Sequence, residues 1–230
     1  MASGLDLDHV MSALEEAGTE QAIKTCRNHG VSSPCLGVRY ADLYKLQKKI
    51  KCDHPLALEL WETGIHDARV LAALILDPEL LDFETLELWV DALSDWWLTM
   101  DLARGAATSS KAKEFAAKWK DDPREFPGQF AWSIYAHLGS EADRLPDGEA
   151  LNLIVQVERE IHGRANRVRY SMGSAMIAFG TRENLRDRVL AAADIIGPIS
   201  VDHGKTNCKT PQIRPGIEQI LAYQARKRNS

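Results

Sequence analysis

The strongest constraint on this chain is a helical period in its apolar residues, which runs through nearly every segment. Between residues 41 and 50, for example, Leu43, Leu46 and Ile50 fall on one side of a helix and three lysines fall on the other. No alternating apolar and polar run is bounded by an Asn-Gly or Asp-Gly hairpin turn. The sequence therefore predicts an all-α fold.

Pro, Gly, Ser and Thr residues divide this pattern into short helical units. Asp53 and Pro55 are typical of a helix cap and a first turn, and the apolar segment Ala68–Leu76 is predicted to lie in the interior. Further helices are expected at 83–92, 95–106 and 111–118, and another is expected to begin at Pro127. Pro146-Asp147-Gly148 breaks the pattern, and helices are expected again at 151–161, 167–179, 183–193 and 215–225.

Helix pairs recur about every 30 to 45 residues, the spacing of HEAT-like repeats, although a compact bundle would give a similar rhythm. We expect a HEAT-like helical-repeat superhelix, an α-solenoid. The predicted parts are an N-terminal helical cap at 1–36, the repeats at 37–196, and a C-terminal loop with a last helix at 197–230, frayed from Lys227 to Ser230.

Composition narrows the class of protein. The 230 residues include no apolar run near the roughly 20 that a membrane span needs, so we expect a soluble, cytoplasmic protein with no membrane partner. Twenty-eight Lys and Arg against 33 Asp and Glu give a net charge of −5. That charge counts against a DNA partner unless the cations cluster on one face.

Two stretches of sequence resemble the DNA alkylation repair family of HEAT-like glycosylases. The first is Gly37-Val38-Arg39-Tyr40-Ala41-Asp42-Leu43, and the second runs from His54 to Arg69. The resemblance continues through Leu74-Ile75 to the pair Trp97-x-x-x-Asp101 and covers roughly 37–180. It implies an all-helical superhelix that cradles duplex DNA, with no metal and no cofactor.

The resemblance also implies a chemistry. Active members of the family hydrolyse the N-glycosidic bond of purines alkylated at N3 or N7, whose base already carries positive charge. Asp101 would stabilise the oxocarbenium ion and direct the attacking water, while Trp97 would form an aromatic wall. Trp96, about 100° away on the helix, is expected in the core. From the residues alone, the favoured interpretation is that Trp97 packs in the core and that Asp101 is an unrelated surface or capping carboxylate.

The sequence departs from the family pattern at two expected site positions. Gln129 stands where active members have a phosphate-binding arginine, so it can donate a hydrogen bond but supplies no charge. Where a second tryptophan is expected, Tyr170 is the nearest aromatic residue. Further DNA contacts are predicted for basic residues that would line one groove if they share a face: Lys45, Lys48, Lys49, Arg167 and Arg169.

The remaining chemical motifs are weak. Asp202, His203 and Cys208 lie in one polar loop, which we interpret as structural closure, with a cysteine enzyme as the alternative. The cysteines at 26, 35, 52 and 208 have neither zinc-site nor disulfide spacing, and His66 is interpreted as an ordinary imidazole. Two functions therefore remain open. One is excision of N3- or N7-alkylated purines from double-stranded DNA, and the other is a non-catalytic scaffold that binds DNA weakly or binds a protein partner.

Overall fold

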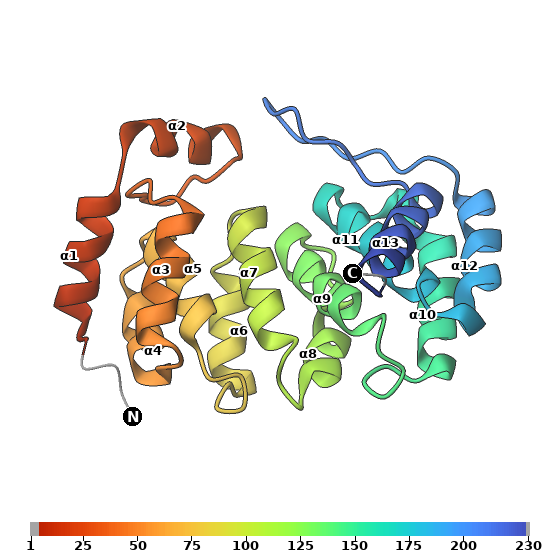
Figure 1. Cartoon of the computed structure of the whole chain (residues 1–230), viewed down its shortest axis with the longest axis horizontal. Helices are drawn as coiled ribbons and strands as arrows, with labels where there is room; N and C mark the ends of the chain where they lie inside the picture. Colours follow the sequence, from red (N-terminus) through yellow and green to blue (C-terminus); the bar gives the residue numbers. More distant parts are fainter. Residues whose placement is uncertain (1–4, 229–230) are drawn as a thin grey trace. The chain divides into compact units, whose positions relative to one another are not determined.

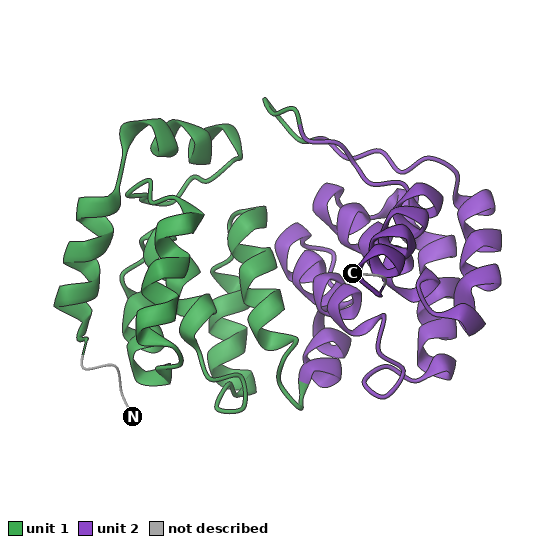
Figure 2. Ribbon diagram, viewed as in Figure 1, with its two compact units in different colours: residues 1–111, 203–207 green, residues 112–202, 208–230 purple. Residues whose placement is uncertain are grey.

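The computed structural model describes residues 5–228, and all the regular structure in that range is helical (Figure 1). The chain forms two compact units (Figure 2). Unit 1 comprises residues 1–111 and 203–207, and unit 2 comprises 112–202 and 208–230. The predicted all-α class is confirmed. The three-part division drawn from the sequence stays a prediction.

Unit 1 contains the first seven helices. They are α1 (Leu7–Ala17), α2 (Glu20–Asn28), α3 (Tyr40–Ile50), α4 (His54–Glu62), α5 (His66–Ile75), α6 (Phe83–Asp91) and α7 (Trp96–Ala106). Five of these helices begin at a capping side chain that accepts a hydrogen bond from a backbone N–H of the first turn: Asp6, Thr19, Asp53, Asp82 and Asp95. The cap at Asp53, with Pro55 in the first turn of α4, confirms the prediction.

Helix α5 is the centre of unit 1 and packs against α3, α4 and α7. Its residues from Ala68 onward are buried apart from Arg69 and Leu74, as the apolar run predicts. Gly105 lets α7 approach α5 closely, since a Cβ at this position would lie only 2.9 Å from the Ala73 carbonyl oxygen. Next to α5, the indoles of Trp61 and Trp89 stack at 4.1 Å between ring centroids. This packing fixes the position of α7, which carries Trp97 and Asp101.

Unit 2 contains the other helices. They are α8 (Ala112–Trp119), α9 (Glu125–Leu138), α10 (Asp147–Glu160), the 3₁₀ turn η1 (Ile161–Gly163), α11 (Asn166–Gly180), α12 (Glu183–Ile196) and α13 (Ile213–Arg228). α9 and α11 form its centre. Their small residues let the two helices approach, and the buried hydroxyls of Ser133 and Ser171 hydrogen bond at 2.9 Å.

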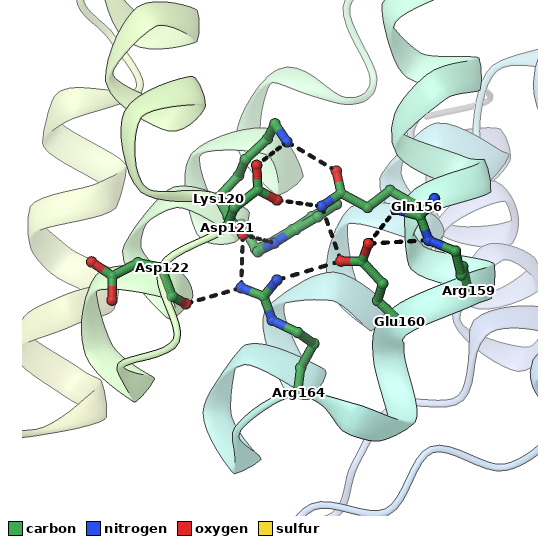
Figure 3. A network of polar contacts seen from close by, with 8 residues as sticks. Lys120, Asp121, Asp122, Gln156, Arg159, Glu160 and Arg164 are labelled. Atoms are coloured by element: carbon green, nitrogen blue, oxygen red, sulfur yellow. Dashed lines mark hydrogen bonds and ion pairs between the residues drawn. The ribbon is translucent and has the colours of Figure 1, made fainter.

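A polar network ties the α8–α9 connection to α10 and η1 (Figure 3). The Arg164 guanidinium donates to the backbone carbonyls of Lys120 (2.8 Å) and Asp122 (3.0 Å). Gln156 accepts from Lys120 Nζ at 3.2 Å and donates to Glu160 at 3.1 Å. Because these cations satisfy backbone and carboxylate groups of their own unit, the network positions the connection.

Several predicted boundaries are wrong by a few residues. α9 begins at Glu125, with Pro127 inside its first turn, and α10 begins at Asp147, directly after Pro146. Proline and glycine are tolerated there because the first four N–H groups of a helix have no intrahelical acceptor. α13 extends from Ile213 to Arg228, so Lys227 is helical, while 229–230 lie outside the described residues.

The segment 197–212 is irregular, as predicted. The side chain of Gln212 accepts from Ile199 N at 2.9 Å and donates to Ile199 O at 3.0 Å, which closes the base of this loop. Residues 203–207 belong to unit 1, where they lie beside the end of α2 around Asn28. Among residues 5–228, none of the helices has the length and apolarity that crossing a bilayer requires.

Candidate functional site

The carboxylate of Asp101 is buried and already has partners on both oxygens. Its residue is 5% exposed. The Tyr40 hydroxyl donates to Oδ2 at 2.6 Å, and Arg104 donates to Oδ1 from the next turn of α7. Arg104 also reaches the hydroxyl of Tyr44 at 3.4 Å. Asp101 is therefore held in a cluster of two tyrosines and one arginine.

These contacts set the protonation of the cluster. Burial raises the pKa of Asp101, and the Tyr40 hydrogen bond and the Arg104 charge lower it only in part. Burial likewise raises the pKa of Tyr40, and the neighbouring Asp101 charge adds to the rise. A carboxylate paired with a guanidinium has little charge left to offer a cationic transition state, because the adjacent cation opposes it.

Trp97 lies on the same side of α7 as Asp101, as the spacing of four residues predicts. Tyr40 links the two: it bonds Asp101, and its ring meets the Trp97 indole edge-on, with centroids 6.0 Å apart and planes at 88°. The imidazole of His29, beyond the end of α2, lies against the same indole at 4.2 Å. The core placement expected for Trp96 is wrong. This side chain is half-buried, and its ring centroid lies 6.2 Å from that of His29.

His66 and Asp95 form a second buried pair beside Trp97. His66 is 3% and Asp95 2% exposed, and His66 Nδ1 lies 3.1 Å from Asp95 Oδ2. The other oxygen of Asp95 caps α7 by accepting from Leu98 N at 2.9 Å. Burial by itself lowers the pKa of His66, but the hydrogen bond and charge of Asp95 outweigh it, so the pKa is raised.

This raised pKa predicts a pH-dependent stability. The His66 contribution is fully present below the unfolded-state pKa, about 6.5, and is lost as the pH rises through the higher folded-state pKa. We expect the free energy of unfolding, measured in urea across that window, to fall more steeply in the native protein than in Asp95→Asn. Parallel pH profiles for the two proteins would contradict the pairing.

Asp67, next to His66, holds the loop between α2 and α3. Its Oδ2 accepts from Leu36 N and its Oδ1 from Val38 N, both at 2.7 Å. The residue is 1% exposed. Asp67 therefore fixes the backbone that leads into Tyr40, the first residue of α3.

The three predicted DNA-binding lysines lie on α3 in unit 1. Lys45 is paired with Asp42 at 2.7 Å, whereas Lys48 and Lys49 are exposed in the last turn. A lysine near the end of a helix also faces the negative end of the helix dipole. The structure therefore brings cations to α3 but places them on its exposed surface.

The other four predicted DNA-binding residues belong to unit 2. Gln129 is fully buried within α9. Arg167 and Tyr170 are half-buried and lie one turn apart on α11. Arg169 donates to the carbonyls of Ser200 (3.0 Å) and Arg164 (2.9 Å), so it supports the loop after α12. Asp101 and Trp97 belong to unit 1, where Tyr40 contacts both, and these four residues belong to unit 2.

Sequence reasoning missed four side chains of the site: Tyr40, Arg104, His66 and Asp95. Two of them left a local signal: Arg104 stands one turn after Asp101 on the same helix, and Asp95 is a capping residue directly before α7. Tyr40 lies 61 residues before Asp101, and His66 lies 29 before Asp95. No periodicity connects residues at such separations.

The thiols are distributed over the fold. Cys26 is buried, Cys35 is half-buried, and Cys52 and Cys208 are exposed. The neighbouring Cys26 thiol and, after it, burial raise the pKa of the Cys35 thiol. Within residues 5–228, no three His, Cys, Asp or Glu side chains gather as they would around a metal ion.

Comparison with known proteins matches the sequence of this chain to a family. The family model described as DNA alkylation repair enzyme matches residues 10–207. The uncharacterized protein Lin0241 of Listeria innocua is 32% identical over 220 residues, which cover 93% of this chain and 95% of that protein. The uncharacterized protein Lmo0209 of Listeria monocytogenes is 30% identical over the same length and coverage.

One solved structure is similar across nearly the whole fold. Its TM-score is 0.86 at 24% sequence identity, and the match covers 96% of this chain and 95% of that one. It represents a new family of proteins related to the HEAT-like repeat DNA glycosylases, with affinity for branched DNA structures. The match confirms the predicted HEAT-like helical fold.

Proposed function

We propose that this chain, which belongs to the DNA alkylation repair enzyme family, binds branched DNA and does not depend on base excision for its function. The observation that carries the proposal is the closed state of Asp101. Its two oxygens are occupied by Tyr40 and Arg104, and only 5% of the residue is exposed. A carboxylate that is buried and hydrogen-bonded in this way stabilises the fold and offers an attacking water little access.

Two further features support DNA binding over excision. Gln129, which the family resemblance aligns with a phosphate-binding arginine, is fully buried and carries no charge. The similar solved structure represents proteins with affinity for branched DNA. Branched DNA offers several duplex arms and a junction, so a protein can bind it through phosphate contacts without reading sequence.

The charge distribution suggests where the phosphates would lie. Unit 1 has eleven Lys and Arg against eighteen Asp and Glu, whereas unit 2 has seventeen against fifteen. In unit 1 the exposed cations Lys48 and Lys49 stand at the end of α3. In unit 2 the last turn of α13 adds three more basic residues: Arg226, Lys227 and Arg228. These two groups are the proposed phosphate contacts. A protein that binds DNA in this way would be intracellular.

The binding proposal predicts a preference for junctions. We expect fluorescence anisotropy to show tighter binding to a four-way junction than to a linear duplex of the same sequence. Replacing both Lys48 and Lys49 by Ala should weaken binding to all forms, and it should reduce the slope of log affinity against log salt by about one for each lost contact. Equal affinity for junction and duplex would contradict the proposal.

The second candidate is excision of N3- or N7-alkylated purines from double-stranded DNA, with Asp101 and Trp97 as catalytic residues. It is favoured by one observation: Tyr40 contacts both side chains, so the carboxylate and the aromatic wall are next to each other. Release of N7-methylguanine and N3-methyladenine from methylated DNA tests it. Release that Asp101→Asn abolishes, and that exposed Asp143→Asn retains, would establish excision and overturn the binding-only proposal.

A further inference from the structure

Unit 1 encloses a cavity of about 270 Å³ next to Trp97, between helices α2, α3, α5 and α7. Its lining is mainly apolar, and the residues used below are Ala22, Thr25, Arg39, Tyr40, His66 and Trp97. The volume is near the lower end of the roughly 300–1,000 Å³ of small-molecule sites, which suits a ligand of one or two rings.

The aromatic walls of this cavity suit a flat ring. Tyr40 and Trp97 meet edge-on with planes at 88°, so they form a corner. The imidazole of His29 lies 4.2 Å from the Trp97 indole and is tilted by only 30°. Trp97 therefore already has a planar nitrogen heterocycle lying against its indole in this structure. Unstacked nucleobases are bound by proteins through the same kind of contact.

The cavity also contains one buried polar group with hydrogen-bonding capacity to spare. His66 is 3% exposed and uses Nδ1 for Asp95. Within residues 5–228, Nε2 of this imidazole makes no hydrogen bond to the protein. The Asp95 contact orients the ring, so Nε2 is left to bond the edge of a ligand inside the cavity.

A cationic group stands at the edge of the cavity. Arg39 lines it, yet its side chain is 71% exposed, and it lies 3.2 Å from Asp42. Lys45 binds the other oxygen of the same carboxylate, so two cations share one anion. The group has a net positive charge, and exposed ion pairs of this kind exchange readily for a phosphate because they contribute little stability.

We propose that this cavity binds a single unpaired nucleobase, with its phosphate on Arg39. The proposal deepens the branched-DNA function and rests on it, since unpaired bases occur where duplex arms meet. The base stacks on Trp97 against Tyr40 and bonds His66 with its edge. A base of a DNA junction and the base of a free nucleotide have the same chemistry, and the experiment separates these sources.

The test compares two three-way junctions of identical arms, one fully paired and one with unpaired adenines at the branch point. We expect anisotropy to show about tenfold tighter binding of the second, the scale of one stacked base. Ala22→Leu fills the cavity and should remove this difference. Ala41→Leu makes the same change on the exposed face of α3 and should retain it. Thr25→Leu is a second cavity-filling variant should Ala22→Leu fail to fold.

A parallel titration with dAMP, followed by tryptophan fluorescence, tests the free nucleotide. If dAMP binds and Ala22→Leu removes this binding, the cavity binds the base of a free nucleotide, which supports the proposal. If the two junctions differ in affinity but dAMP does not bind, the cavity binds a base only as part of DNA, which also supports the proposal. Equal binding of both junctions together with no dAMP binding overturns the cavity proposal and leaves branched-DNA binding intact. If no DNA binds at all, the branched-DNA function fails, and the dAMP titration alone decides the cavity.

Discussion

Replacing Asp67 by Ala is expected to destabilise the protein by about 3 to 5 kcal/mol. The substitution leaves the backbone N–H groups of Leu36 and Val38 without their acceptor, and each buried unsatisfied donor costs about 1 to 3 kcal/mol. The rest of the cost has two sources. The carboxylate charge no longer strengthens these two hydrogen bonds, and removing a side chain that is 1% exposed leaves a small cavity. Urea unfolding at constant pH measures the change.

Glu59→Ala is the control for this prediction. Glu59 is an exposed carboxylate on the neighbouring helix α4, and its removal should change the free energy of unfolding by less than about 0.5 kcal/mol. For a chain of this length, the Asp67 variant should lose roughly 10 °C in thermal midpoint. Equal midpoints for the two variants would show that Asp67 does not hold the loop between α2 and α3.

Gly37→Ala is expected to cost more than about 3 kcal/mol. Gly37 has φ +76°, a conformation that costs an L residue roughly 1 to 2 kcal/mol. A Cβ there would also collide with the Thr19 carbonyl oxygen and lie 2.8 Å from Ile23 N. Both are backbone atoms at the start of α2. Because Thr19 N donates to Gly37 O at 3.0 Å, the two backbone segments are tied together and neither can move away alone.

Gly30→Ala separates the two causes. Gly30 also has positive φ, +87°, but a Cβ there would meet nothing within 4 Å. The Gly30 variant should therefore show the conformational cost alone, and the Gly37 variant should unfold at clearly lower urea concentration. If both variants lose the same stability, the close packing of Gly37 against α2 contributes nothing measurable.

Local features of this chain could be predicted from its sequence. Asp53 with Pro55 predicts the start of α4, the run from Ala68 predicts a buried α5, and a spacing of four residues places Trp97 and Asp101 on one face of α7. Pro127 does not mark the start of α9 to the residue, because proline is tolerated at several positions of a first turn and also ends helices.

The partners of the buried charges could not be predicted in this way. Asp101 is held by Tyr40, which is 61 residues away, and Asp67 by Val38, which is 29 away. Helix caps and helix faces depend on residues within about one turn, so the sequence by itself determined the helices, their apolar sides and the family. Whether Asp101 stays open to a substrate depends on which distant helix packs against it. Only the tertiary structure decided that, because burying a carboxylate requires donors that the packing of α3 on α5 and α7 supplies.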